Sequence, residues 1–145
     1  MKLRQRALNL LARREHSRAE LVRKLAEHAE ADEIAALLDA LQDEGLLSNQ
    51  RFAESLAHAR QGRHGSLRLR ADLQNKGVSE VESEQVIAIA RSQDFSAAQT
   101  IWRKKFGLPP HDAAERVRQM RFLAGRGFPA EVVRRVLGGG DDDSF

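Results

Sequence analysis

Residues 17–24 read Ser17-Arg18-Ala19-Glu20-Leu21-Val22-Arg23-Lys24. A serine followed three positions later by a glutamate is typical of a capping box, in which the serine oxygen accepts a backbone N–H and the glutamate reaches back to the serine amide. A similar segment recurs as Phe128-Pro129-Ala130-Glu131-Val132-Val133-Arg134-Arg135, and a second capping box lies between them at Ser79-Glu80-Val81-Glu82. These segments predict the starts of short helices, and their recurrence predicts an internal repeat.

Apolar residues recur at helical spacing along the whole chain, as in the stripe formed by Ile34, Leu37, Leu38 and Leu41. Signals for strands are almost absent, since the chain has no tyrosine and no Asn-Gly or Asp-Gly turn. Expected C-caps are Gly45, Gly77 and Gly107, and Pro129 suits a first helical turn. We predict nine helices, near residues 3–15, 17–28, 33–44, 49–62, 66–76, 79–91, 94–106, 111–125 and 129–137.

The nine expected helices group into three sets of three. The second helix of each of the first two sets carries an apolar pair four residues apart, Leu21 with Leu25 and Leu69 with Leu73, and the third set carries a similar pair, Val132 with Val136, in its last helix. A helix of about 12 residues spans only about 18 Å, so each small bundle needs a neighbour. We therefore predict an all-α fold of three tandem three-helix repeats that form an elongated, curved array. The repeats cover residues 1–48, 49–92 and 93–138, and residues 139–145 form a flexible acidic tail.

The composition is that of one globular domain, with 145 residues of which 31% are charged and 41% apolar. The absence of cysteine excludes disulfides, thiolate metal sites and a cysteine nucleophile. The longest apolar runs, such as residues 34–38, are far shorter than the about 20 residues that cross a bilayer, and no signal-peptide segment begins the chain. We expect a soluble, cytoplasmic protein that does not contact membranes.

The net charge of +3 conceals a local excess of basic residues. Residues 51–126 hold 14 basic and 8 acidic side chains, whereas residues 1–50 hold 8 and 9, and residues 127–145 hold 2 and 4. A basic middle segment suits a polyanionic or acidic partner, and guanidinium groups bind phosphates and carboxylates bidentately. The predicted partner-binding and DNA-binding residues are Arg60, Arg63, Arg68, Arg70, Lys76, Arg103, Lys104, Lys105, Arg116, Arg118, Arg121 and Arg126.

The alternative is that these charges are simply solvated, and Arg68, for example, has Asp72 four residues later as an ion-pair partner. The run Arg103-Lys104-Lys105 lies at an expected helix end, where the helix dipole favours a cation. Three consecutive cations exceed what the dipole explains, so we expect this run to contact nucleic acid or a protein partner. Trp102 and Phe106 lie on an apolar stripe, which indicates core packing in preference to base stacking.

No catalytic or metal-binding arrangement is visible. The five histidines lack zinc-ligand spacing, and neither a Gly-x-Ser-x-Gly elbow nor a phosphate-binding glycine loop occurs. His16, which precedes the capping Ser17, is expected to be a structural turn residue. Gly62-Arg63-His64-Gly65 matches the glycine-flanked loop of KH domains, but these need a β-sheet, so we predict a turn between helices. We expect no enzyme, metal, cofactor or small-molecule substrate.

Several blocks resemble RecX regulatory proteins. They are residues 7–21, residues 38–48, Arg51-Phe52-Ala53-Glu54-Ser55, Arg103-Lys104-Lys105-Phe106-Gly107, residues 119–123 and Arg126-Gly127-Phe128. Their ordered set is more specific than any one block and covers the chain except for residues 138–145. One departure is Asn49-Gln50, where the family often has an acidic residue soon after the serine, and this weakens a capping box at Ser48.

The resemblance implies three tandem three-helix repeats and a function. RecX proteins bind the RecA recombinase along its nucleoprotein filament and suppress its ATPase, strand-exchange and coprotease activities. This resemblance therefore implies a regulator of DNA repair, recombination and the SOS response. Its expected partners are RecA and the RecA-DNA filament, with weak, sequence-nonspecific binding of nucleic acid, and we expect a monomer.

Other interpretations are open from the sequence. Residues 7–48 also look like a helix-turn-helix that begins a winged-helix DNA-binding domain, with residues 17–28 as recognition helix. Against it stand the nearly balanced charge of that helix and the continued helical pattern after Leu47. A third possibility is a helical scaffold that binds a protein unrelated to recombination. The acidic residues 141–143 either form a disordered end or fold back on the basic face.

Overall fold

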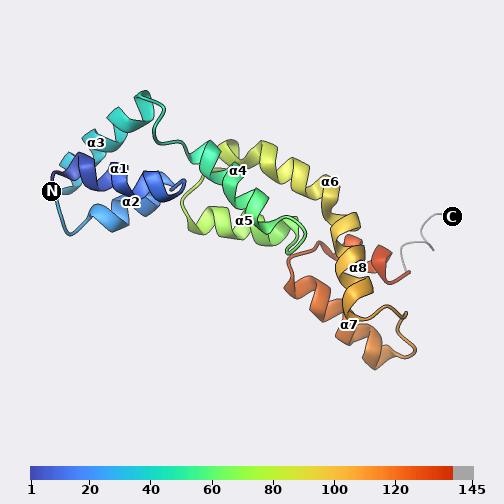
Figure 1. Ribbon diagram of the computed structural model, residues 1–145. Coiled ribbons are helices and arrows are strands. Elements are labelled where there is room, and N and C mark those ends of the chain that lie inside the picture. Colours follow the sequence, from blue (N-terminus) through green and yellow to red (C-terminus); the bar gives the residue numbers. More distant parts are fainter. Residues whose placement is uncertain (139–145) are drawn as a thin grey trace. The chain divides into compact units, whose positions relative to one another are not determined.

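The computed structural model describes residues 1–138, and the predicted acidic tail lies outside them (Figure 1). Within this range the chain is helical and has no strand. The helices are α1 (Leu3–Arg13), α2 (Arg18–Leu25), α3 (Ala31–Asp43), α4 (Asn49–Arg60), α5 (Ser66–Asn75), α6 (Glu80–Lys105), α7 (Ala113–Gly125) and α8 (Ala130–Val136). The predicted all-α fold is confirmed.

The chain divides into two compact units, which we describe separately. The first unit contains residues 1–56 and 73–83, and the second contains residues 57–72 and the chain from Glu84 onward. The predicted boundary between residues 92 and 93 falls inside α6.

The core of the first unit lies among α1, α2 and α3, which pack together in Figure 1. Its fully buried members are Ala7, Leu21, Leu25, Ile34, Leu38, Leu41 and Leu47. The stripe predicted on α3 supplies three of these side chains, so its helical spacing faces the core as expected. Burying one leucine contributes about 1.5–3 kcal/mol, so this cluster is the main source of the unit's stability.

The predicted helix boundaries have the expected local chemistry. The Ser17 hydroxyl accepts a hydrogen bond from the Glu20 amide at 3.1 Å, and the Glu20 carboxylate accepts one from the Ser17 amide at 3.0 Å. Ser79 and Glu82 form the same reciprocal pair at 3.1 and 2.9 Å. Gly77, after the last turn of α5, has a φ of 77°, a left-handed conformation that glycine adopts without strain. Both predicted capping boxes are confirmed.

The core of the second unit lies among α6, α7 and α8. Its buried members are Ala98, Leu123, Phe128, Val132, Val133 and Leu137. Trp102 packs against this cluster, and its indole N–H donates to the side-chain oxygen of Gln119 at 2.8 Å. The predicted structural role of Trp102 is therefore confirmed. Pro129 is the N-cap of α8, one position before the first helical turn in which it was expected.

The prediction of nine helices is wrong at one place, because the two helices expected at 79–91 and 94–106 are the single helix α6. Residues 91–94 contain neither glycine nor proline to end a helix. The Ser92 hydroxyl donates a hydrogen bond to the Ile89 carbonyl at 2.6 Å, so the hydroxyl has a partner within the helix and does not cap a new one. Asp94 caps a different helix, since its carboxylate accepts the amide and hydroxyl of Ser66 at the start of α5.

Helix α2, the recognition helix of the winged-helix alternative, uses its polar side chains within the first unit. Arg18 donates to Asp39 at 2.8 Å, and the buried Glu20 carboxylate forms an ion pair with the more exposed Arg14 at 3.0 Å. The residues after Ser48 continue as α4, and no strand in the described chain forms a β-wing. These observations give the winged-helix interpretation no support.

Candidate partner-binding site

The end of α6 and one face of α7 bring two aromatic rings together. The rings of Phe106 and Phe122 meet edge to face, with centroids 5.4 Å apart and planes at 90°. This is a favoured geometry for an aromatic pair, because the positive edge of one ring meets the negative face of the other. Both rings are only partly buried, so they form part of the surface as well as packing against each other.

Three of the predicted basic residues surround this aromatic pair. Lys105 Nζ lies 5.4 Å and Arg126 Cζ 4.9 Å from the centroid of Phe122, and Arg118 Cζ lies 5.5 Å from that of Phe106. Cations at such distances are attracted to the ring face, by about 0.5–1 kcal/mol at exposed sites. We call Lys105, Phe106, Arg118, Phe122 and Arg126 the basic-aromatic cluster. It holds cationic groups in defined positions beside apolar surface.

A cavity of about 480 Å³ opens beside the cluster, where the chain turns from α6 into α7. Lys105, Phe106 and Arg118 line it, together with Leu108, whose side chain is 75% exposed. Exposed apolar groups and aromatic rings next to arginine are typical of protein interfaces, where they supply contact area beside charge complementarity. The cavity therefore extends the cluster into a surface suited to a protein or nucleic-acid partner.

Buried Gln119 holds the cavity in shape. Its amide donates to the Leu108 carbonyl at 3.1 Å and to the Glu115 carboxylate at 3.0 Å, and its oxygen accepts from Trp102. The hydrogen bond from Gln119, and the charge and hydrogen bond of Arg118, lower the pKa of Glu115. Glu115 is thus a carboxylate that orients Arg118, with Nη1 to Oε1 at 3.1 Å.

The remaining predicted residues of the second unit divide into two groups. Arg60 and Arg68 both turn toward Asp72, with N to O distances of 2.9 and 3.5 Å, so their charges are used internally. The others lie on the surface of the turn between α4 and α5, of α5, or of α6 and α7. They are Arg63, Arg70, Arg103, Lys104 and Arg121, together with the half-buried Arg116.

Contacts outside their own helices show which of two predicted residues, Arg126 and Lys76, belongs to the basic-aromatic cluster. Arg126 Nη1 donates to the backbone carbonyl of Arg63 at 3.2 Å, which joins the predicted turn at residues 62–65 to the basic-aromatic cluster. Lys76 belongs to the first unit, where its ammonium lies 3.4 Å from the Glu20 carboxylate. Arg63 is thus brought to the cluster, and Lys76 is not.

Phe122 is the main functional candidate that the sequence analysis missed. Arg118, Phe122 and Arg126 are spaced by four residues, which places a ring between two guanidinium groups along one side of α7 and its C-cap. That spacing is a usable signal. The contact with Phe106 depends on tertiary structure and has no such signal.

Residues 1–138 contain neither a candidate metal site nor a helix that could span a membrane. No three histidine, aspartate or glutamate side chains there come together in a group that could hold a metal ion. No helix in the described chain is long and apolar enough to span a membrane.

Comparison with known families assigns all three helical segments. Residues 4–41 match the first three-helix domain of RecX, residues 48–87 the second, and residues 92–137 the third. The three matches follow the order of the family, which agrees with the predicted number and order of the repeats. A RecX crystal structure from Lactobacillus salivarius has the same fold, with a TM-score of 0.79 at 19% identity over 96% of this chain and 94% of that one.

Relatives of higher identity extend over nearly the full sequence. The regulatory protein RecX of Ralstonia pickettii (strain 12J) is 48% identical over 98% of this chain and 90% of its own length. That of Chromobacterium violaceum is 46% identical over 99% of this chain and 93% of its own length. Identity at this level across all three domains shows that the chain belongs to the RecX family of regulatory proteins.

Proposed function

We propose that this protein binds the RecA recombinase and its DNA filament and inhibits the ATPase, strand-exchange and coprotease activities of RecA. The observation that carries this proposal is the RecX match over all three helical domains, residues 4–137. In this role the protein regulates DNA repair, recombination and the SOS response. It acts on another protein's activity as a cytoplasmic monomer, without catalysis, a metal or a cofactor of its own.

The basic-aromatic cluster supports a binding role for the third domain. Lys105 and Arg126 are held over Phe122, so part of the conformational entropy that an interface residue loses on binding is already lost in the free protein. Arg103 and Lys104 are exposed in the last turn of α6 beside Lys105, with no ion pair to any described residue. These groups are available to carboxylates of RecA and to phosphates of the bound DNA.

Three small domains in one chain also support binding to a repetitive partner. Separate modest contacts by linked domains add through effective concentration, so overall affinity exceeds that of any single domain. Binding to DNA alone is expected to be weak and independent of sequence. In that case phosphate contacts dominate, and the affinity falls steeply with salt.

The direct test is titration of this protein into RecA hydrolysing ATP on single-stranded DNA. We expect inhibition by the wild-type protein and weaker inhibition by the triple variant R103E/K104E/K105E, with unchanged helix content by circular dichroism. The matched control is K2E/R23E/R91E, which makes the same charge change at exposed residues outside the predicted set. This control should inhibit as the wild type does.

Two results would contradict the proposal at different levels. If the wild-type protein leaves the RecA ATPase unchanged at saturating concentration, inhibition of RecA is not its function. If both triple variants lose inhibition equally, overall charge matters and the segment 103–105 is not a specific contact. Sequence-specific protection of duplex DNA in the absence of RecA would favour a stand-alone DNA-binding regulator instead.

A further inference from the structure

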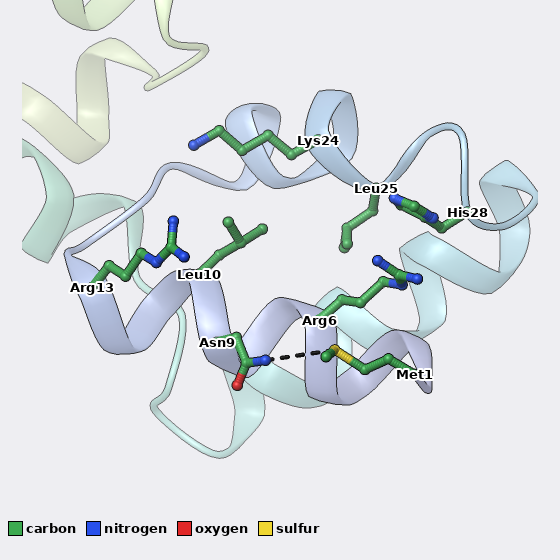
Figure 2. Close-up of a pocket in the computed structure, with 8 residues that line it drawn as sticks. All are labelled: Met1, Arg6, Asn9, Leu10, Arg13, Lys24, Leu25 and His28. Carbon is green, nitrogen blue, oxygen red and sulfur yellow. Dashed lines mark hydrogen bonds between the residues drawn. The ribbon is translucent and has the colours of Figure 1, made fainter.

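The first unit has a cavity of its own between α1 and α2, with a volume of about 270 Å³ (Figure 2). Leu10 of α1 and Leu25 of α2 form its apolar part. Its charged or titratable lining residues are Arg6, Arg13, Lys24 and His28, and no acidic residue of the described chain lines it. None of these residues was among the binding residues predicted from the sequence.

The charged side chains lie at two ends of the cavity. Figure 2 shows Arg13 and Lys24 toward one end and Arg6 and His28 toward the other, with the leucine side chains between them. A ligand in the cavity would therefore contact apolar surface at its middle and cationic or titratable groups at both ends. The volume lies below the about 300–1,000 Å³ typical of pockets for drug-sized ligands, so it suits one side chain of a larger partner.

Arg6 and Arg13 have no carboxylate partner, unlike Arg4 and Arg14 in or next to the same helix. Arg4 pairs with Glu44 at 2.6 Å and Arg14 with Glu20 at 3.0 Å, whereas neither Arg6 nor Arg13 forms an ion pair with any described residue. Arg6 is also half-buried. A partly desolvated cation without a counter-charge is costly, so an incoming anion that pairs with it is stabilised.

Lys24 is held in place by a neutral neighbour that leaves its charge available. Its Nζ lies 3.0 Å from Nε2 of His16. Burial lowers the pKa of His16, and the charges of Arg14 and Lys24 lower it further against the raising effect of its backbone contact. The neutral imidazole accepts a hydrogen bond from the ammonium through Nε2, and its other nitrogen lies 3.1 Å from the Arg14 carbonyl. Lys24 is therefore positioned by His16 and forms no ion pair with any described residue.

The chemistry of this cavity favours a peptide over a nucleic acid. Guanidinium groups bind carboxylates bidentately, and the leucine side chains offer contact to an apolar group between two such carboxylates. Proteins that bind single-stranded nucleic acid instead stack bases on aromatic side chains, and among the described residues the imidazole of His28 is the one aromatic group that lines this cavity.

We propose that the α1–α2 cavity binds an acidic segment of a partner protein in which an apolar side chain is flanked by carboxylates. Arg6 and Arg13 pair with the carboxylates, Lys24 adds a third positive charge, and Leu10 and Leu25 contact the apolar side chain. The site is separate from the basic-aromatic cluster in its residues and its unit, and it does not depend on RecA being the partner.

The test uses the full chain, isotope-labelled, and nuclear magnetic resonance to follow backbone amides during titration. The probe is the peptide acetyl-Glu-Glu-Leu-Glu-Glu-amide, and the matched peptide carries serine in place of leucine. We expect the leucine peptide to shift the amides around Leu10 and Leu25, and to bind more tightly than the serine peptide. Binding should weaken with salt, because exposed Arg13 contributes through a screened interaction.

The variant R6Q/R13Q should weaken binding of the leucine peptide by about tenfold or more, since it removes two charge-assisted contacts. The control K2Q/R23Q makes the same charge change at exposed residues outside the cavity and should bind as the wild type does. Equal affinity for the two peptides, or equal effects of the two variants, would overturn the proposal. Binding of oligodeoxythymidine at the same amides, without binding of the peptide, would assign the cavity to nucleic acid.

Discussion

The hydroxyl of Ser17 donates a hydrogen bond to the backbone carbonyl of Lys76, at 2.7 Å and across 59 positions of sequence. The same oxygen accepts the Glu20 amide, so one side chain caps the start of α2 and also binds the end of α5. Gly77 makes this approach possible, because a β-carbon there would lie 2.7 Å from that of Ala19. The contact ties residues of the first helical domain to residues 73–83 within the first unit.

Substitution S17A is expected to lower the free energy of unfolding by about 2 kcal/mol. It removes a helix cap, and it leaves the Lys76 carbonyl without its side-chain donor. Urea denaturation followed by circular dichroism measures this loss. The control is S96A, at an exposed position inside α6, which should change stability by less than about 0.5 kcal/mol. Equal stability of S17A and S96A would show that the Ser17 contacts contribute nothing.

Glu20 makes the free energy of unfolding of the first unit depend on pH in the acidic range. Burial alone raises its pKa, but the hydrogen bonds from Arg14 and the Ser17 amide and the charges of Arg14 and Lys76 outweigh burial and lower the pKa to about 2. Because the folded pKa lies below the unfolded value of about 4.5, the carboxylate stabilises the fold above that value. This contribution, on the order of 3 kcal/mol, is lost as the pH falls from about 4.5 toward 2.

The variant E20Q should therefore be less stable than the wild type at about pH 6, and this difference should shrink at about pH 2.5. Urea denaturation at both pH values measures it. The control E54Q removes an exposed carboxylate that has no ion pair to any described residue, so it reports the effect of one negative charge alone. A constant difference between wild type and E20Q at both pH values would contradict the role assigned to this ion pair.

Local signals in the sequence predicted most of the helix boundaries. The reciprocal bonding of Ser17 with Glu20, and the left-handed glycine after α5, each depend on residues within a few positions of one another. The wrong boundary near residues 91–94 has the opposite origin. Asp94 is a residue type that caps helices and lies where a helix start was expected, yet its carboxylate caps the helix that begins at Ser66, 28 positions earlier. Only tertiary packing decides between those two partners.

The candidate site was predictable only in part for the same reason. Counting charged residues by segment located the basic middle of the chain, and three of its cations, Lys105, Arg118 and Arg126, do surround one aromatic pair. The same segmentation could not separate them from Arg60, whose charge is used by Asp72. It also overlooked the α1–α2 cavity, since unpaired arginines there are hidden by the acidic residues of the same segment.

Substitution G65A should destabilise the second unit by about 2–3 kcal/mol. A β-carbon at Gly65 would lie 2.5 Å from the Gly127 carbonyl oxygen and 2.6 Å from the buried ring of Phe128. The Gly65 amide also donates a hydrogen bond to the Arg126 carbonyl at 2.8 Å, which holds the two segments together. Thermal unfolding measures the effect.

The control for that experiment is G125A, because a β-carbon at Gly125 meets no atom within 4 Å and the residue lies inside α7. Alanine is favoured over glycine in a helix by about 0.5–1 kcal/mol, so G125A should be neutral or slightly stabilising. Similar melting temperatures for G65A and G125A would show that the close approach of residues 65 and 127 is not required for the fold.

Two variants distinguish arginines that bind a partner from arginines that stabilise the fold. R60Q removes the 2.9 Å ion pair to Asp72, whose side chain is only 20% exposed, so we expect a loss of about 1–3 kcal/mol in stability and unchanged inhibition of RecA. R103Q/K104Q removes two exposed charges that form no ion pair with any described residue, so stability should stay within about 0.5 kcal/mol while inhibition weakens. Urea denaturation and the RecA ATPase assay, run on the same preparations, measure both quantities. The opposite pattern, with inhibition lost in R60Q and kept in R103Q/K104Q, would move the contact surface away from the end of α6. All three residues belong to the same unit, but Arg60 has the internal partner Asp72, whereas Arg103 and Lys104 are exposed at the end of α6.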